Sequence, residues 1–314
     1  MRKLLVLGGA GFIGTNLVDF INRNRAEEIL VLDKMLFDNN LVKAGIKCEF
    51  IKADINENQI LSSILKSFHP DQIIHLAANS DIKKSSLGIN PDLKNTLGTT
   101  LSLASALVRH PVQSVVFAST GAVYGVSSSP LREDSPKYPI SAYGWMKLAS
   151  EEVLLSSLKN QNIQNLLIAR FPNVTGFWQT HGVVYDLANS IKKNPKKLQV
   201  LGDGTQRKPY CSAATLSRAL MEISDQQRIR GERELVVNLS PSDDIEVSEI
   251  VNELCLQFGV NPQIDYGTKS YGWEGDVPRY SYDTSRSKNY LGGIEFEPSI
   301  SVIRESVKWA SENL

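Results

Sequence analysis

A tyrosine and a lysine four residues apart are the side chains of this sequence that best fit acid–base chemistry. Tyr143 precedes Lys147 in the run YGWMK, and it is the only one of the ten tyrosines with a lysine four residues later. On a helix this spacing puts both side chains on one face. An ordinary tyrosine has a pKa near ~10, and an adjacent ammonium favours the phenolate. The pair therefore predicts a phenol with a lowered pKa that serves as a base.

A glycine-rich turn directly follows the first apolar run of the chain. The run LLVL leads into Gly8, and Gly11 and Gly14 follow in GGAGFIG. The first glycine permits a tight turn, the second lets the backbone approach a pyrophosphate, and the third lets the next helix pack on the strand. The amino end of that helix offers free N–H groups to phosphates. This segment predicts a dinucleotide site.

The second apolar run ends in an acid, Asp33, and a basic residue, Lys34, comes next. A carboxylate at this point accepts hydrogen bonds from both ribose hydroxyls of an adenosine and repels a 2′-phosphate. The expected cofactor is therefore NAD rather than NADP, a preference that Lys34 softens.

Apolar runs alternate with amphipathic stretches through the first half of the chain. The expected strands are 4–7, 29–32, 47–51, 72–76, 114–118 and 166–169, and the expected helices between them are 13–23, 57–68, 93–109 and 142–159. This alternation predicts an α/β fold with a Rossmann-type, doubly wound parallel sheet. Further helices are expected at 183–193, 213–225, 246–258 and 301–312. We expect an NAD-binding domain over 1–170 and a smaller substrate-binding region over 171–314, from which some segments return to the main sheet.

Composition narrows the partners and the compartment. The 34 Lys and Arg residues balance 34 Asp and Glu residues, and a neutral chain argues against nucleic acid as the main partner. The cysteines, Cys48, Cys211 and Cys255, are scattered and show no metal-ligand spacing with the four histidines. No metal site is expected. The apolar run near the first residue is too short for a signal peptide, and none reaches bilayer length. We expect a cytoplasmic protein that does not contact membranes.

Together these motifs resemble the extended branch of the short-chain dehydrogenase/reductase superfamily, the NAD-dependent epimerase/dehydratase family. Further matches are ADI after the third run, HLAA after the fourth and NTLGT in the following helix, and the resemblance extends over nearly the whole chain. It implies NAD as cofactor, a nucleotide-diphospho-sugar as substrate, and a homodimer formed through helices 93–109 and 142–159. The cofactor contacts that it implies are Gly8, Gly11, Phe12, Ile13, Gly14, Asp33, Lys34, Asp54, Ile55, Leu76, Ala77, Ala78, Asn95, Ser119, Tyr143, Lys147 and Pro172.

The resemblance also implies a third catalytic group beside Tyr143 and Lys147. Thr120, in the segment ASTGAVYG, matches the hydroxyl that bonds the reacting sugar oxygen and passes a proton to Tyr143. Ser119 is a close alternative. Lys147 would also hold the nicotinamide ribose.

Related branches add an acid or base where this sequence has Gly121 and Ala122. The 4,6-dehydratases carry an Asp–Glu pair there, decarboxylases a glutamate at the second position, and 3,5-epimerase/reductases a cysteine. What remains is hydride transfer and one proton at the same carbon, which predicts C4 epimerisation through a transient 4-keto sugar, as in UDP-glucose 4-epimerases. Alternatives are a nucleotide-4-keto-sugar reductase, another NAD-dependent nucleotide-sugar oxidoreductase and, least favoured, a non-catalytic NAD-binding protein.

Later segments resemble the substrate motifs of the family, with departures. Arg207, after the turn GDGTQ, matches a phosphate-binding arginine, and Lys208 is the alternative if the alignment slips by one. Galactose epimerases generally carry arginine where Trp273 stands, so Trp273 either stacks on a base or sugar or packs the loop, and Arg279 would replace the missing charge. UDP, dTDP, CDP and GDP all stay open as the nucleotide. The implied substrate contacts are Thr120, Asn173, Arg207, Trp273, Asp276 and Arg279.

Overall fold

The computed structural model describes residues 1–35, 40–57, 59–79 and 90–314. Within them a seven-stranded sheet has the order β11-β6-β5-β4-β1-β2-β3, and all of its strand pairs are parallel. Its strands are β1 (Lys3–Leu7), β2 (Glu28–Asp33), β3 (Glu49–Lys52), β4 (Gln72–His75), β5 (Val112–Thr120), β6 (Ile163–Phe171) and β11 (Glu234–Asn238). The chain order reverses between β1 and β4, as in a doubly wound sheet. The predicted Rossmann-type fold is confirmed.

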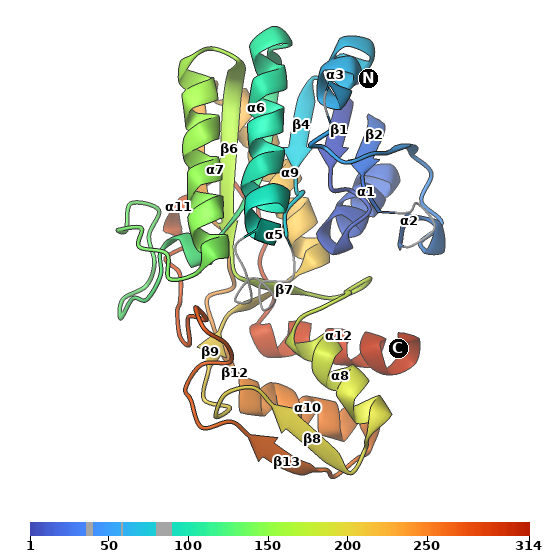
Figure 1. Cartoon of the computed structure of the whole chain (residues 1–314), viewed down its shortest axis with the longest axis vertical. Helices are drawn as coiled ribbons and strands as arrows, with labels where there is room; N and C mark the ends of the chain where they lie inside the picture. Colours follow the sequence, from blue (N-terminus) through green and yellow to red (C-terminus); the bar gives the residue numbers. More distant parts are fainter. Residues whose placement is uncertain (36–39, 58, 80–89) are drawn as a thin grey trace.

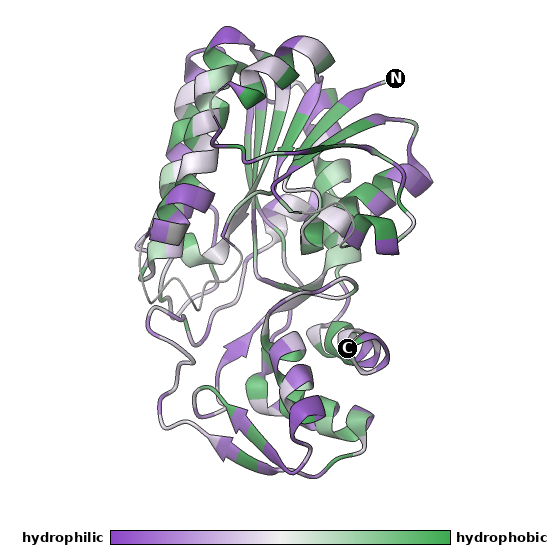
Figure 2. Cartoon of the chain, turned by 45° about the vertical axis from the view of Figure 1, so that its right-hand side comes forward, coloured by the Kyte–Doolittle hydropathy of each residue, from purple (hydrophilic) through white to green (hydrophobic). Residues whose placement is uncertain are grey.

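Helices cover both faces of this sheet (Figure 1). One face packs against α1 (Phe12–Asn24) and α9 (Ala213–Ile229), and the other packs against α3 (Ile60–Phe68), α6 (Thr99–Arg109) and α7 (Ala142–Lys159). Leu4 and Val6 of β1 point to the first core, while Leu5 and Leu7 point to the second. Since side chains alternate along a strand, burial of both faces explains the continuous apolar runs, which Figure 2 shows in green along the central strands.

The residues after β6 form a second region, drawn below the sheet in Figure 1. Its elements are β7 (Asn173–Thr175), α8 (Val183–Lys193), β8 (Lys197–Val200), β9 (Arg207–Lys208), β10 (Tyr210–Ser212), β12 (Ile245–Glu246), α10 (Val247–Phe258), β13 (Gln263–Tyr266) and α12 (Ser299–Asn313). The small sheets pair β10 with β7, β12 with β9 and β13 with β8. A separate apolar core joins α8, α10 and α12. The helix α9 and the strand β11 leave this region and join the main sheet.

Several predicted elements differ from the observed ones. The predicted helix 93–109 is a short α5 (Asn90–Asp92), a π-helical segment η1 (Leu93–Gly98) and then α6. The predicted helix 57–68 begins at Ile60, and residue 58 lies outside the described residues. The two short helices α2 (Asn40–Lys43) and α11 (Ser285–Lys288) were not predicted. A search of the described residues finds no helix with the length and apolar character needed to span a bilayer.

Candidate active site

The carboxyl ends of the parallel strands bring distant motifs to one edge of the sheet. Since β1, β4, β5 and β6 run in the same direction, the residues that follow them meet at that edge. The glycine turn follows β1, the segment HLAA spans the end of β4, and Thr120 ends β5. In open α/β sheets the ligand site lies outside these ends, at the point where the strand order reverses.

The glycine turn has the shape that a pyrophosphate requires. Gly8 has a φ of +82°, and a Cβ on it would lie 2.7 Å from the backbone nitrogen of Ala77. A Cβ on Gly11 would have only the Gly8 carbonyl oxygen within 4 Å, at 3.4 Å. The helix α1, which begins with Phe12 and Ile13, has no side-chain cap on its first N–H groups. The open side of Gly11 is therefore a cradle that a larger residue would fill, and the turn fits a dinucleotide phosphate.

Asp33 sits at the end of β2 with 7% of its surface exposed. Its Oδ2 accepts a hydrogen bond from Ala10 N at 3.0 Å, and its Oδ1 accepts one from Met35 N at 2.9 Å. Each carboxylate oxygen has a second lone pair, so the group can still accept ribose hydroxyls. Lys34 Nζ donates to Asn95 Oδ1 at 2.9 Å, so these two predicted cofactor contacts lie next to each other. Asn95 lies on the π-helical segment η1.

The other predicted cofactor positions in the first half surround the same edge. Ala53 N donates to the Asp33 carbonyl at 3.1 Å, which puts Asp54 and Ile55 next to the end of β2. Leu76 N donates to the Leu7 carbonyl at 2.9 Å, and Ala77 and Ala78 follow against the glycine turn. Pro172 lies between the ends of β6 and the start of β7.

Tyr143 and Lys147 lie on the first turns of α7. Ser141 caps this helix by accepting from Gly144 N at 3.1 Å. Lys147 is 2% exposed, its Nζ donates to the Ala118 carbonyl of β5 at 2.7 Å, and it stands 6.0 Å from the centroid of the Tyr143 ring. The two side chains predicted from their spacing are thus neighbours, and they face the end of β5.

The protein groups around Tyr143 do not by themselves lower the pKa of its phenol. Burial raises the pKa of Tyr143, and the negative charge of Asp92 raises it further. Burial lowers the pKa of Lys147 to about 7, while the charge of Glu151 acts in the opposite direction. Loss of hydration penalises both charged forms. The phenol therefore needs an added positive charge before it can act as a base at neutral pH.

Ser119 and Thr120 have different surroundings. Ser119 is 1% exposed, and its Oγ donates to Glu151 Oε1 at 2.5 Å. The same carboxylate accepts a hydrogen bond at Oε2 from Arg170 Nη2, at 2.6 Å. Thr120 Oγ1 accepts from Ala122 N at 3.2 Å, which leaves its own proton to donate. Neighbouring strand residues point to opposite faces. The arrangement favours Thr120 as the hydroxyl that faces a substrate.

Arg207 and Lys208 likewise point to opposite sides of β9. The guanidinium of Arg207 forms ion pairs with Asp244 at 2.6 Å and Glu246 at 3.3 Å, and it lies 3.8 Å from Glu249. Lys208 is 7% exposed, and its ammonium pairs with Asp276. The predicted phosphate-binding role of Arg207 is therefore not favoured, because three carboxylates already surround it. Lys208 is the inward-facing cation.

The remaining predicted substrate residues fall into two groups. Asn173 is the register partner of Tyr210 in the β7–β10 pair. Lys208 Nζ lies 5.2 Å from the centroid of the Trp273 ring. The buried Nε1 of Trp273 has no hydrogen-bond partner among the described residues. Arg279 is exposed and donates to the Thr205 carbonyl at 3.3 Å. The structure brings Trp273 and Asp276 together around Lys208 and leaves Arg279 on the outside.

The comparisons with known proteins identify the family of the chain. The model of the NAD dependent epimerase/dehydratase family matches residues 4–238. The chain belongs to this family. It is 28% identical to a putative UDP-glucose 4-epimerase of Methanocaldococcus jannaschii, over 99% of both chains, and 25% identical to a dTDP-glucose 4,6-dehydratase of Neisseria meningitidis, over 100% of this chain and 94% of the other.

Solved structures of similar proteins carry the same fold. A crystal structure of UDP-galactose 4-epimerase covers 100% of both chains with a TM-score of 0.86 and 25% identity. The protein MoeE5 in complex with UDP-glucuronic acid and NAD has a TM-score of 0.87 and 26% identity, over 99% of this chain and 100% of that one. The family is NAD-dependent, which agrees with the predicted cofactor, and its members are epimerases and dehydratases. The chain is an enzyme of this class.

Sequence reasoning missed two buried acids near Tyr143 and Lys147. Glu151 follows Lys147 by one further helical turn, so the spacing that found the lysine also contains a signal for this carboxylate. The charge of Asp92 raises the pKa of Tyr143. Asp92 lies on the short helix α5, far from Tyr143 in the sequence. No local pattern indicates that contact.

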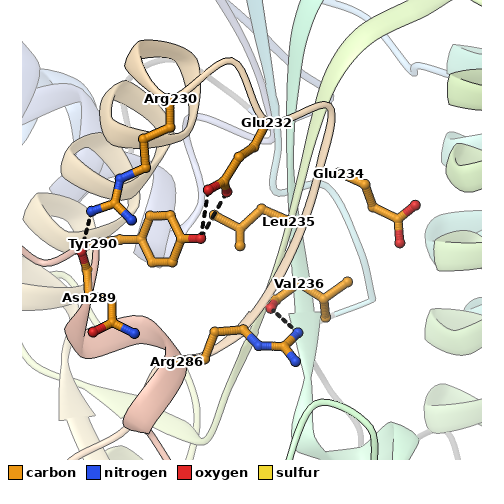
Figure 3. A pocket seen from close by; sticks show the side chains of 8 residues that line it. All are labelled: Arg230, Glu232, Glu234, Leu235, Val236, Arg286, Asn289 and Tyr290. Carbon is orange, nitrogen blue, oxygen red and sulfur yellow. Dashed lines mark hydrogen bonds between the residues drawn. The ribbon is translucent and has the colours of Figure 1, made fainter.

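A surface hollow elsewhere on the molecule holds none of the predicted site residues (Figure 3). It lies beside the edge strand β11 and is lined by Arg230, Glu232, Glu234, Leu235, Val236, Arg286, Asn289 and Tyr290. Several of its polar groups bind each other: Tyr290 Oη donates to Glu232 Oε2 at 2.8 Å, and Arg286 Nη1 donates to the Val236 carbonyl at 3.2 Å. The part of the chain that the structure describes contains no cluster of three potential metal ligands.

Proposed function

We propose that this protein is an NAD-dependent nucleotide-diphospho-sugar 4-epimerase. The observation that carries the proposal is the pairing of Tyr143 and Lys147 with Thr120, followed by Gly121 and Ala122, whose side chains cannot move protons. Such a site has one proton-transfer group and lacks the added acid and base that a dehydration needs. We propose NAD as the cofactor of this chain, held at the glycine turn and Asp33.

In this proposal Tyr143 accepts the proton of the sugar C4 hydroxyl and later returns it. Thr120 donates a hydrogen bond to the same oxygen and positions it. Lys147 holds the nicotinamide ribose, and its ammonium stabilises the Tyr143 phenolate. Bound NAD⁺ would supply a hydride acceptor and donor at C4 and the positive charge that the half-buried phenol needs.

The substrate diphosphate is proposed to bind Lys208, with Asn173 as a second contact. Lys208 replaces the predicted Arg207, since it is buried beside Trp273 and Asp276. An ammonium is a point charge without the fork of a guanidinium, so it binds phosphate with less geometric selection. UDP is the first nucleotide to test. The division into an NAD-binding part, 1–170, and a substrate-binding part, 171–314, is kept as a proposal.

A homodimer is proposed through α6 and α7, which pack side by side. Both helices and the η1 segment carry exposed apolar side chains, among them Leu93, Leu101, Val108 and Trp145. We expect twice the chain mass by light scattering, and a monomer when Leu101 and Val108 are both replaced by glutamate. A monomeric unmodified protein with full activity would contradict this proposal.

The test of the epimerase is incubation with a panel of UDP-, dTDP-, GDP- and CDP-hexoses, followed by NMR of the C4 configuration. We expect interconversion of the C4 epimers without added NADH, and release of one nicotinamide dinucleotide on denaturation. A reductase would instead consume NADH in stoichiometric amounts and leave an oxidised cofactor in solution. A 4-keto-6-deoxy product would identify a dehydratase and refute the proposal.

A further inference from the structure

A buried ion pair joins the helix that carries Tyr143 and Lys147 to the main sheet. Glu151, one turn beyond Lys147 on α7, is 0% exposed, and Arg170, near the end of β6, is 2% exposed. Arg170 Nε donates to Glu151 Oε1 at 2.9 Å, and its Nη2 donates to Oε2 at 2.6 Å. This bidentate contact fixes the orientation of the carboxylate as well as its distance from the guanidinium.

The same ion pair is bound to the chain on both sides of Thr120. Before Thr120, Ser119 Oγ donates to Glu151 Oε1 at 2.5 Å, and Ser119 is the register partner of Arg170 in the β5–β6 pair. After Thr120, the 3-10 turn ends at Tyr124, whose hydroxyl oxygen accepts from Arg170 Nη1 at 2.9 Å. The segment that carries Thr120 is therefore held at both of its ends.

Three successive turns of α7 contact this segment of β5 and the turn that follows it. A Cβ on Gly144 would lie 2.6 Å from the Ala122 carbonyl oxygen, so the first turn packs directly on the backbone. Lys147 Nζ donates to the Ala118 carbonyl at 2.7 Å, and Glu151 follows one turn later. Two hydrogen bonds join Glu151 to the guanidinium and one joins it to β5, so the ion pair is the main lock on the position of the helix.

We propose that Glu151, clamped by Arg170, is a positioning residue for the C4 chemistry, because the ion pair sets both the place of α7 relative to the end of β5 and the charge beside the reactive face of the helix. The inference rests on the proposed function, in which Tyr143 and Lys147 act together with Thr120. Neither member of the pair is a catalytic residue, since both are buried and bind protein groups. Their effect on the reaction passes through the side chains that they hold.

The charge of the pair acts on the reactive groups in a definite direction. Burial lowers the pKa of Lys147, and the charge of Glu151 opposes that decrease. Two further described groups face this site: His75 of β4, which is neutral because burial lowers its pKa to about 3, and Asp92, whose charge raises the pKa of Tyr143. Loss of the Glu151 charge would leave its guanidinium partner unopposed, and added positive charge lowers the pKa of a phenol and of an ammonium alike.

The first test removes the pair as a unit in the double variant Glu151→Met/Arg170→Met. Replacement of both members of a buried ion pair by apolar residues is often tolerated, so the variant reports on position and not on an unpaired charge. We expect kcat for C4 epimerisation to fall about tenfold, as misplaced reacting groups require, while KM and NAD content stay within about twofold. The control Arg25→Met/Asp225→Met removes a partly buried pair beside the amino ends of the strands and should leave kcat within about twofold.

The second test is Glu151→Gln, which keeps the shape of the side chain and an acceptor for Ser119 but removes the charge. Because the pKa values of Tyr143 and Lys147 should both fall, we expect both limbs of the pH profile of kcat to move to lower pH by about one unit. In the NAD-loaded protein the Tyr143 phenolate, followed by its ultraviolet difference spectrum against Tyr143→Phe, should also form at lower pH. This titration needs no substrate.

A folded double variant with unchanged kcat would overturn the proposal, and so would a KM that rises as far as kcat falls. If the double variant does not fold, Glu151→Gln decides: an unchanged pH profile together with an unchanged phenolate titration would overturn the proposal. Inactivity of the unmodified protein on the whole sugar panel would refute the proposed function, and the phenolate titration would then still judge Glu151.

Discussion

The two parts of the molecule each contain a buried lysine, and they hold it in different ways. Lys147, on the sheet side, donates to a backbone carbonyl, and the carboxylate whose charge acts on it, Glu151, is committed to Arg170. Lys208, in the later region, is ion-paired with Asp276. The first ammonium is held by a neutral partner, so its charge is available to a neighbour. The second is already neutralised, and a substrate anion has to compete for it.

This difference separates what the two regions contribute. At the sheet edge, contacts within the protein hold Lys147 and Thr120, the groups to which we assign the chemistry, and a fixed position of such groups favours reaction. In the later region an anion that reaches Lys208 must replace part of the interaction with Asp276. We therefore expect substitutions at the sheet edge to act on the rate of the chemical step and substitutions around Lys208 to act on KM.

The largest effect is expected from Tyr143→Phe, which removes the proton-transfer group. General acid–base catalysis contributes about 10²–10⁴-fold, so kcat should fall by roughly 10³-fold, with KM and bound NAD nearly unchanged. Steady-state kinetics and the nucleotide content of the purified variant measure this. The exposed Tyr138 provides the control as Tyr138→Phe. Near-native turnover by Tyr143→Phe would show that the sheet edge does not set the rate of the chemical step.

The next effect separates the two hydroxyls at the end of β5. Thr120→Ala should lower kcat about 100-fold with little change in Tm, since one positioned donor to a reacting oxygen is lost. Ser119→Ala should keep kcat within a few fold and lower the free energy of unfolding by about 1–3 kcal/mol, because Glu151 loses a buried partner. Kinetics together with urea unfolding measure both. The reverse pattern would make Ser119 the catalytic hydroxyl.

The later region is tested by Lys208→Met, for which we expect KM to rise about 10–100-fold while kcat changes little. A hydrogen bond to a charged group contributes about 1.5–3 kcal/mol, which corresponds to this range. The matched variant Arg207→Met should change KM less than twofold, since that guanidinium is held by surface carboxylates. If Arg207→Met has the larger effect on KM, the assignment of the inward cation is wrong.

The smallest effect is the change of stability with pH that follows from the lowered pKa of Lys147. Its folded pKa of about 7 lies below the ordinary value of 10.5, so the unfolded chain binds more protons between these pH values. The stability penalty is therefore full below pH 7 and shrinks as pH rises toward 10.5. In protein stripped of nucleotide, Lys147→Met should raise Tm more at pH 6 than at pH 9, relative to the exposed Lys159→Met. A gain that does not change with pH would contradict the buried, unpaired ammonium.

The fold and the proximity of Tyr143 to Lys147 could be predicted because their signals are local. The bounds of α7 match the predicted range 142–159, and the helix begins directly after a capping residue, Ser141. The strands of the main sheet could be predicted because burial on both faces makes them continuous apolar runs. The π-helical segment Leu93–Gly98 could not be foreseen, because its backbone is decided by packing against α6 and α7.

The substrate side was less predictable because its geometry depends on long-range pairing. Whether Arg207 or Lys208 points inward is decided by the two-residue strand β9, which pairs with β12 and forms a bridge from Arg207 to Arg279. The contact between Tyr282 and Gly121 joins segments from opposite halves of the chain. The raised pKa of Tyr143 also escaped prediction, because neither its burial nor the neighbouring Asp92 is visible in the sequence.

The hydrogen bond from Arg286 to the Val236 carbonyl has a consequence for how copies of this protein behave in concentrated solution. Val236 belongs to β11, one of the two edge strands of the main sheet, and an edge strand offers free backbone groups to any extended segment that approaches. The Arg286 guanidinium donates a hydrogen bond to one of those carbonyls, that of Val236. Glu232 and Glu234 add negative charge along the same edge. Strand addition there would have to displace the arginine first, so we expect this margin of the sheet to disfavour pairing with another chain.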